Sequence, residues 1–165
     1  MSRISILLAE DHEALRKGLR SLLSLLADLR IAGEAVDGLQ AVEMAARLKP
    51  DVVLMDISMP RLNGLEALRL ILARRPATRV IMLSGHAEEA YILRSESLGA
   101  AGFISKHGCL DQLPEAIRDA RRGRPFFRPG GPPAADAPPT RRHARDRSPR
   151  PRRPQANPDR AGPRT

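Results

Sequence analysis

Short apolar runs alternate with amphipathic segments five times along the first 123 residues. The apolar runs predict buried strands at 4–9, 31–36, 52–55, 79–84 and 101–105. Segments with apolar residues at three- and four-residue spacing predict helices at 12–27, 39–49, 65–75, 87–98 and 110–123. Strands that are apolar on both faces are typical of a parallel sheet with helices on each side. The alternation therefore predicts an α/β fold with a five-stranded, doubly wound parallel sheet.

Individual residues mark the ends of several predicted helices. Pro50 and Pro76 follow the second and third helices and are expected to stop them. Asn63 is expected to cap the third helix, and Gly99 to follow the end of the fourth. Pro114 is compatible with the fifth helix only near its first turn.

The last 45 residues differ sharply in composition from the body. Residues 1–120 hold 15 Lys+Arg and 16 Asp+Glu, whereas residues 121–165 hold 13 Arg and 3 Asp. Beyond residue 128 there is no Ile, Leu, Val, Met or aromatic residue to offset the entropy of ordering. We therefore expect two parts, a domain at 1–123 and a Pro/Arg-rich disordered tail at 124–165. Such a tail is also typical of GC-rich coding sequence read out of frame, a hypothesis that translation of the other frames tests.

The cellular location of the protein is predicted from three features that its sequence lacks. The chain has one cysteine and so forms no intrachain disulfide, as is usual in a reducing cytoplasm. Its N-terminus does not resemble a signal peptide, and no run reaches the roughly 18 apolar residues of a membrane helix. These features predict a cytoplasmic protein without membrane contact.

Three acids follow two of the predicted strands. Glu10 and Asp11 come after the first strand, and Asp56 comes directly after the third. Doubly wound sheets bind ligands outside the carboxyl ends of their strands, so these acids are expected to meet. Three adjacent carboxylates repel one another unless a cation neutralises them, and oxygen ligands suit Mg²⁺. The sequence therefore predicts a magnesium site.

Two further side chains at strand ends extend the predicted site. Lys106 follows the fifth strand and Ser84 ends the fourth. Together with the acids they suit phosphoryl transfer, with Asp56 as the nucleophile. Asp11 would hold the metal, Glu10 would assist directly or through water, and Lys106 and Ser84 would contact phosphoryl oxygens. Each residue alone is more typical of a helix cap or a solvated loop, so the prediction rests on the whole set.

The residues that carry a family resemblance span about 3–123. They are ILLAEDHEALRKGLRSLL, then GEAVDGLQAVEMAARLKPDVVLMDISMPRLNGLEAL, then VIMLSGHAEEAYILRSESLGAAGFISK. This pattern, with its D-x-x-M-P-x-x-N-G block, resembles the receiver domain of bacterial two-component response regulators of the NarL/FixJ type. The resemblance implies the CheY-like, or flavodoxin-like, (βα)5 fold, with Asp56 as phosphoacceptor, Glu10 and Asp11 as the Mg²⁺ pair, and the Ser58 backbone carbonyl as a further ligand.

The resemblance also implies a switch. Ser84 and Lys106 match the family's switch hydroxyl and lysine, and Phe103 matches its rotating aromatic, although an aromatic in a strand is commonly just core. A sensor histidine kinase would phosphorylate Asp56. The phosphoryl group would draw Ser84 and Phe103 inward and alter the surface of the fourth helix, fifth strand and fifth helix. That surface would control homodimerisation or transcription. The chain is expected to be no enzyme beyond self-phosphorylation and autodephosphorylation at Asp56.

Two positions depart from the resemblance. His107 follows Lys106 where many receivers have proline, which affects the geometry of that loop. NarL/FixJ regulators usually continue into a DNA-binding helix-turn-helix, which needs helical apolar periodicity that 129–165 lacks. The alternative is thus a stand-alone receiver, or a truncated or frameshifted regulator whose basic tail makes only non-specific nucleic-acid contacts.

Two enzyme-like or ligand-binding alternatives lack their motifs. An aspartyl-phosphate phosphatase would need a second acid two residues after Asp56, where Ser58 stands. A nucleotide-binding domain would need a glycine-rich loop after the first strand, where the sequence reads EDHEALRKG.

Overall fold

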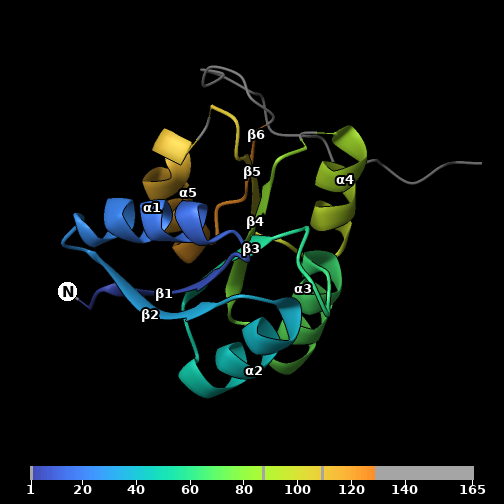
Figure 1. Cartoon of the computed structure of the whole chain (residues 1–165), viewed down its shortest axis with the longest axis horizontal. Coiled ribbons are helices and arrows are strands. Elements are labelled where there is room, and N and C mark those ends of the chain that lie inside the picture. Colours follow the sequence, from blue (N-terminus) through green and yellow to red (C-terminus); the bar gives the residue numbers. More distant parts are fainter. Residues whose placement is uncertain (1, 87, 109, 129–165) are drawn as a thin grey trace, which may run out of the picture. The chain divides into compact units, whose positions relative to one another are not determined.

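A single parallel sheet organises the part of the chain that the computed structural model describes, residues 2–86, 88–108 and 110–128. The strand order is β2-β1-β3-β4-β5-β6, and every neighbouring pair is parallel (Figure 1). Order reverses between β1 and β3, which places the topological switch point there. The strands are β1 (Ile4–Ala9), β2 (Leu29–Ala35), β3 (Val52–Asp56), β4 (Arg79–Ser84), β5 (Gly102–Ser105) and β6 (Phe126–Arg128).

Helices cover both faces of this sheet (Figure 1). Buried residues of α1 and α5 share one apolar cluster with alternate residues of the strands. Residues of α2, α3 and α4 pack against the opposite cluster. The helices are α1 (Glu13–Ser24), α2 (Gly38–Leu48), α3 (Gly64–Arg74), α4 (Glu89–Ser97) and α5 (Leu113–Arg121), with a 3-10 turn, η1 (Leu110–Gln112), before α5. The predicted α/β fold with a doubly wound parallel sheet is confirmed.

Helix starts follow the chemistry of the residues that precede them. Asn63 caps α3, because its Oδ1 accepts a hydrogen bond from the Glu66 N–H at 2.9 Å. Asp37 caps α2 in the same way, accepting from the Gln40 N–H at 2.8 Å. Pro114 lies in the first turn of α5, where a missing N–H costs nothing. The predicted roles of Asn63 and Pro114 are confirmed.

The five predicted strands are joined by a sixth that the sequence analysis did not predict. β6 pairs in parallel with the outer edge of β5, although its residues were assigned to the tail. A strand of three residues is too short for a periodic pattern to reveal. The predicted disorder of 129–165 concerns residues outside the described ones, and the domain boundary stays a prediction.

Among the helices that the described residues form, none is both long enough and apolar enough to cross a bilayer.

Candidate functional site

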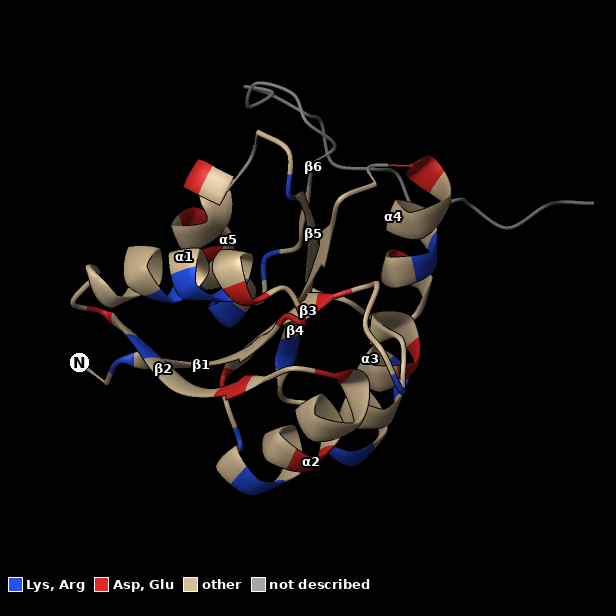
Figure 2. Ribbon diagram, in the orientation of Figure 1, with Lys and Arg blue, Asp and Glu red and all other residues tan. Residues whose placement is uncertain are grey.

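The three predicted acids meet at the carboxyl ends of β1 and β3. The register pairs Ala9 with Met55, so the residues that follow on each strand emerge side by side. One carboxylate oxygen from each of Glu10, Asp11 and Asp56 lies within 4.8 Å of the others. Glu10 and Asp56 are buried, whereas Asp11 is exposed. Acidic residues, drawn in red, gather at this end of the sheet (Figure 2).

Lys106 brings a positive charge into this acidic cluster. Its Nζ lies 2.7 Å from Glu10 Oε2 and 3.0 Å from Asp56 Oδ1. The backbone fixes the same residue, because the Lys106 N–H donates to the Ser84 carbonyl at 2.8 Å. The Lys106 side chain therefore bridges the ends of β1, β3 and β5.

Glu10 is held from two sides but keeps one oxygen for a cation. Its Oε1 accepts a hydrogen bond from the His12 N–H at 3.0 Å, and its carbonyl accepts one from Arg16 Nη1 at 2.8 Å. Its Oε2 is buried, and among the described residues its partner is the Lys106 ammonium at 2.7 Å. A buried carboxylate oxygen of this kind is a fitting ligand for a hard cation. Arg16, in the first turn of α1, was not predicted as a site residue, because its contact with the Glu10 carbonyl appears only in the folded chain.

Burial changes the acidity of the proposed nucleophile. Burial raises the pKa of Asp56 to about 6, with repulsion from Glu10 acting in the same direction. The hydrogen bond from Lys106 opposes this rise and does not cancel it. Burial lowers the pKa of Lys106, but its contacts with Glu10 and Asp56 outweigh burial and raise that pKa overall. Lys106 therefore stays positively charged beside Glu10 and Asp56.

The two predicted serines border Asp56 differently. The Ser58 N–H donates to Asp56 Oδ1 at 3.2 Å, and the Ser58 side chain is exposed. Ser84 follows Leu83, the register partner of Asp56 on β4, and is buried. Its Oγ accepts a hydrogen bond from the His86 N–H at 3.0 Å. The structure thus places both serines on segments that adjoin Asp56.

Phe103 is fully buried in β5, as its alternative interpretation as a core residue expects. It belongs to the cluster beneath α2, α3 and α4, and its register partners are Met82 on β4 and Phe127 on β6. The Phe103 side chain is therefore already buried here, as it would be after the expected inward movement.

A close approach of backbone explains the glycine that begins α3. A Cβ on Gly64 would overlap the carbonyl oxygen of Asp56, so only glycine fits there. The Gly64 N–H also donates to the Ile57 carbonyl at 2.8 Å. The loop after Asp56 is thereby folded back against the end of β3.

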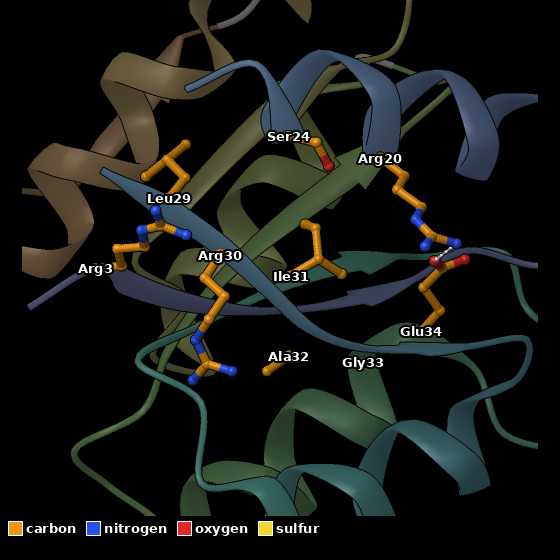
Figure 3. Close-up of a pocket in the computed structure, with 9 residues that line it drawn as sticks. All are labelled: Arg3, Arg20, Ser24, Leu29, Arg30, Ile31, Ala32, Gly33 and Glu34. Atoms are coloured by element: carbon orange, nitrogen blue, oxygen red, sulfur yellow. Dashed lines mark ion pairs between the residues drawn. The ribbon is translucent and has the colours of Figure 1, made fainter. Parts of the chain in front are cut away.

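A separate hollow of about 420 Å³ runs along β2, away from these residues. Three arginines line it, Arg3, Arg20 and Arg30, and Arg20 forms an ion pair with Glu34 at 3.1 Å (Figure 3). None of the predicted site residues lines this hollow. The acidic cluster, not this hollow, is therefore our candidate functional site.

Comparison with known proteins agrees with this geometry. Residues 6–118 match the family model of the response regulator receiver domain. The chain belongs to this family. It is thus a receiver domain of the two-component response regulators, as the resemblance predicts.

Relatives include regulators of transcription and an enzyme. The transcriptional regulatory protein DegU of Brevibacillus brevis is 34% identical over 128 residues, covering 78% of this chain and 54% of DegU. The protein-glutamate methylesterase/protein-glutamine glutaminase of Thermotoga maritima is 44% identical over 128 residues, covering 71% of this chain and 37% of that protein. This chain therefore spans about half the length, or less, of these curated relatives.

A solved structure supports the same assignment. The LuxR-family two-component response regulator from Aurantimonas sp. SI85-9A1 has a TM-score of 0.73 and 30% identity. The match covers 76% of this chain and 89% of that one. Receiver domains generally act as switches without an activity of their own, yet the methylesterase relative shows that the family includes enzymes.

Proposed function

We propose that Asp56 accepts a phosphoryl group from a sensor histidine kinase and that this modification switches the receiver. The observation that carries the proposal is the Asp56 carboxylate at the mouth of the sheet, 3.0 Å from Lys106 Nζ and grouped with Glu10 and Asp11. A carboxylate can act as a nucleophile when its neighbours stabilise the charge of the transferred group. An Asp56 oxygen would form the new bond to phosphorus while the bond from phosphorus to the kinase histidine breaks.

The acidic cluster is proposed to hold Mg²⁺. Asp11 and Asp56 would be side-chain ligands, Glu10 would act directly or through water, and the Ser58 carbonyl would complete the protein ligands. The donor set fits, because all of these are oxygens and one carboxylate oxygen from each of Glu10, Asp11 and Asp56 lies within 4.8 Å of the others. When bound, Mg²⁺ would offset charge on the attacking and leaving oxygens.

Lys106 and Ser84 are proposed to hold the phosphoryl group once it is attached. The Lys106 ammonium already lies within ion-pair distance of Asp56 and can follow an oxygen added there. Ser84 Oγ accepts a backbone hydrogen bond and keeps its own proton to donate. Both residues lie at strand ends that adjoin Asp56, and the phosphoryl group would draw the Ser84 side chain inward.

The output of the switch is proposed from the relatives. Phosphorylation would change homodimerisation or the regulation of transcription, because the match to DegU is to a transcriptional regulator. DNA contact would come from a further domain or, weakly and without sequence specificity, from the basic residues after 128. The chain itself would catalyse nothing beyond its own phosphorylation and dephosphorylation.

Labelling with a small phosphodonor tests the acceptor. The full chain is incubated with acetyl phosphate and Mg²⁺ and resolved on a Phos-tag gel, which retards phosphorylated protein. We expect one retarded band that disappears in Asp56→Asn. The matched control is Asp111→Asn, an exposed acid in η1, which keeps the band. A retarded band in Asp56→Asn would show that another residue is the acceptor.

A further inference from the structure

β6 is attached to the strand that leads directly into the proposed phosphoryl site. The register pairs Gly102 with Phe126 and Phe103 with Phe127. The Phe126 N–H also donates to the Ala101 carbonyl at 2.9 Å, just before β5 begins. Lys106 is the first residue after β5. One strand of four residues thus connects the lysine of the site with β6.

Side chains fasten β6 to both faces of the sheet. Phe126 is buried in the cluster shared with α1 and α5. Phe127 is half-buried and packs against the opposite cluster, which contains Phe103. Gly102 permits the close approach, because a Cβ there would lie 2.7 Å from the Phe126 carbonyl oxygen. The position of β6 therefore depends on the position of β5.

The end of β5 is linked to the acidic cluster through Lys106. This residue makes three contacts: its N–H donates to the Ser84 carbonyl, and its ammonium forms ion pairs with Glu10 and Asp56. A phosphoryl group on Asp56 would add an anion with about two charges within reach of the ammonium. Lys106 would then be held more tightly, and the backbone of β5 with it.

We propose that β6 carries the state of Asp56 to the chain beyond residue 128. Phosphorylation stabilises the end of β5, a better-ordered β5 strengthens the pairing with β6, and the attachment point of the following segment becomes fixed. This inference rests on Asp56 being the phosphoacceptor. Coupling of this kind is reciprocal. Pairing of β6 with β5 therefore also strengthens the contacts that hold a phosphoryl group, or a bound analogue of it, at Asp56.

Hydrogen exchange of the full chain tests the coupling. Backbone amide exchange is followed by mass spectrometry with Mg²⁺ alone and with Mg²⁺ plus beryllofluoride, a phosphoryl analogue. Three backbone amides are followed. Those of Ser58 and Lys106 report on the proposed phosphoryl site, and that of Phe126 reports on β6. We expect beryllofluoride to slow exchange at all three, with a severalfold effect at Phe126.

The outcomes separate this inference from the proposed function. Slower exchange at Ser58 and Lys106 with no change at Phe126 would overturn the relay and leave the acceptor intact. No change at any of the three would overturn the acceptor assignment and the relay together.

Substitution in β6 tests the reciprocal effect. Phe127→Ala should weaken beryllofluoride binding by about fivefold, the low end of typical allosteric couplings. Leu25→Ala is the matched control, because Leu25 lies at the end of α1 and is 83% exposed. Should Phe127→Ala fail to fold, Phe127→Leu keeps an apolar side chain and is expected to weaken binding by a smaller factor. Unchanged affinity in a folded Phe127 variant would overturn the proposal.

Discussion

The surroundings of Asp56, the proposed phosphoacceptor, destabilise its charged carboxylate form. Asp56 is 3% exposed, close to Glu10, and only partly compensated by Lys106. Its pKa of about 6 lies above the ordinary value of 3.8, so folding opposes its ionisation. In the folded state Asp56 therefore binds its proton more tightly than in the unfolded state. Its contribution to stability is fully present below about pH 4 and is lost as the pH rises through about 6.

Removing this carboxylate should stabilise the protein at neutral pH. In buffer with EDTA at pH 7, Asp56→Asn is expected to raise the free energy of unfolding by about 2 kcal/mol, because the buried charge is gone. At pH 4 both proteins carry a neutral group there, and the difference should shrink towards zero. Urea unfolding at the two pH values measures both quantities. A gain that is equally large at pH 4 would show that packing, not charge, is responsible.

The Lys106 ammonium compensates two buried carboxylates, so its loss should cost stability. Lys106→Met is expected to lower the free energy of unfolding by about 3 kcal/mol, because Glu10 and Asp56 remain buried without their cation. Adding Glu10→Gln to this variant should recover part of the loss. Urea unfolding of the single and double variants measures the coupling.

An exposed ion pair supplies the control for this prediction. Lys17 Nζ lies 2.6 Å from Glu13 Oε1 on α1, and both side chains are more than 60% exposed. Lys17→Met should change the free energy of unfolding by less than about 0.5 kcal/mol, because solvent screens this pair. Equal effects at Lys17 and Lys106 would contradict the importance of burial.

At the scale of elements, α3 is positioned by its first residues. Asn63 caps the helix, and Gly64 brings its backbone against the end of β3. The cap makes the helix begin there, and the missing side chain lets it begin close to Asp56. Local chemistry at one helix start thus fixes the loop that borders the acidic cluster.

Two glycine substitutions should have opposite effects. Gly64→Ala is expected to destabilise by roughly 3 kcal/mol or more, because its Cβ would overlap backbone that cannot move aside. Gly18→Ala, in the middle of α1, has no atom within 4 Å of the added Cβ and should stabilise by about 0.5–1 kcal/mol. Thermal or urea unfolding of each variant gives the sign. A stable Gly64→Ala protein would mean that the loop after Asp56 can adopt another path.

At the scale of the whole described domain, sheet topology creates the site. β1 and β3 are neighbours although 42 residues separate Ala9 from Val52, and β5 adds Lys106 from further along the chain. Charges so far apart in sequence meet because the carboxyl ends of parallel strands share one edge. Any cation that relieves their repulsion should therefore stabilise the fold as a whole.

Magnesium should raise the melting temperature of the protein. Binding to the folded state alone shifts the unfolding equilibrium by mass action, by about 2.7 kcal/mol at a hundred times the dissociation constant. We expect the melting temperature to rise with Mg²⁺ concentration and to return to its starting value with EDTA. Asp11→Asn should abolish most of this rise, whereas Asp111→Asn should keep it. A rise that is unchanged in Asp11→Asn would place the metal elsewhere.

Local sequence alone determined the alternation of elements and the position of the acids. Ile4–Ala9 and Arg79–Ser84 have the bounds that the apolar runs predict, and Asn63 caps the predicted helix. These features depend on near neighbours in the chain, which the sequence displays directly. The grouping of Glu10, Asp11 and Asp56 was also predicted, because strand ends in a doubly wound sheet converge.

Tertiary structure alone decided how these parts interact. The ion pairs of Lys106, the raised pKa of Asp56, the burial of Phe103 and the pairing of β6 all depend on contacts between distant segments. A pKa follows from burial and neighbouring charge, and three residues of strand have no period that a sequence can show. Periodicity reveals which face of an element is buried, whereas only the folded sheet determines what that face meets.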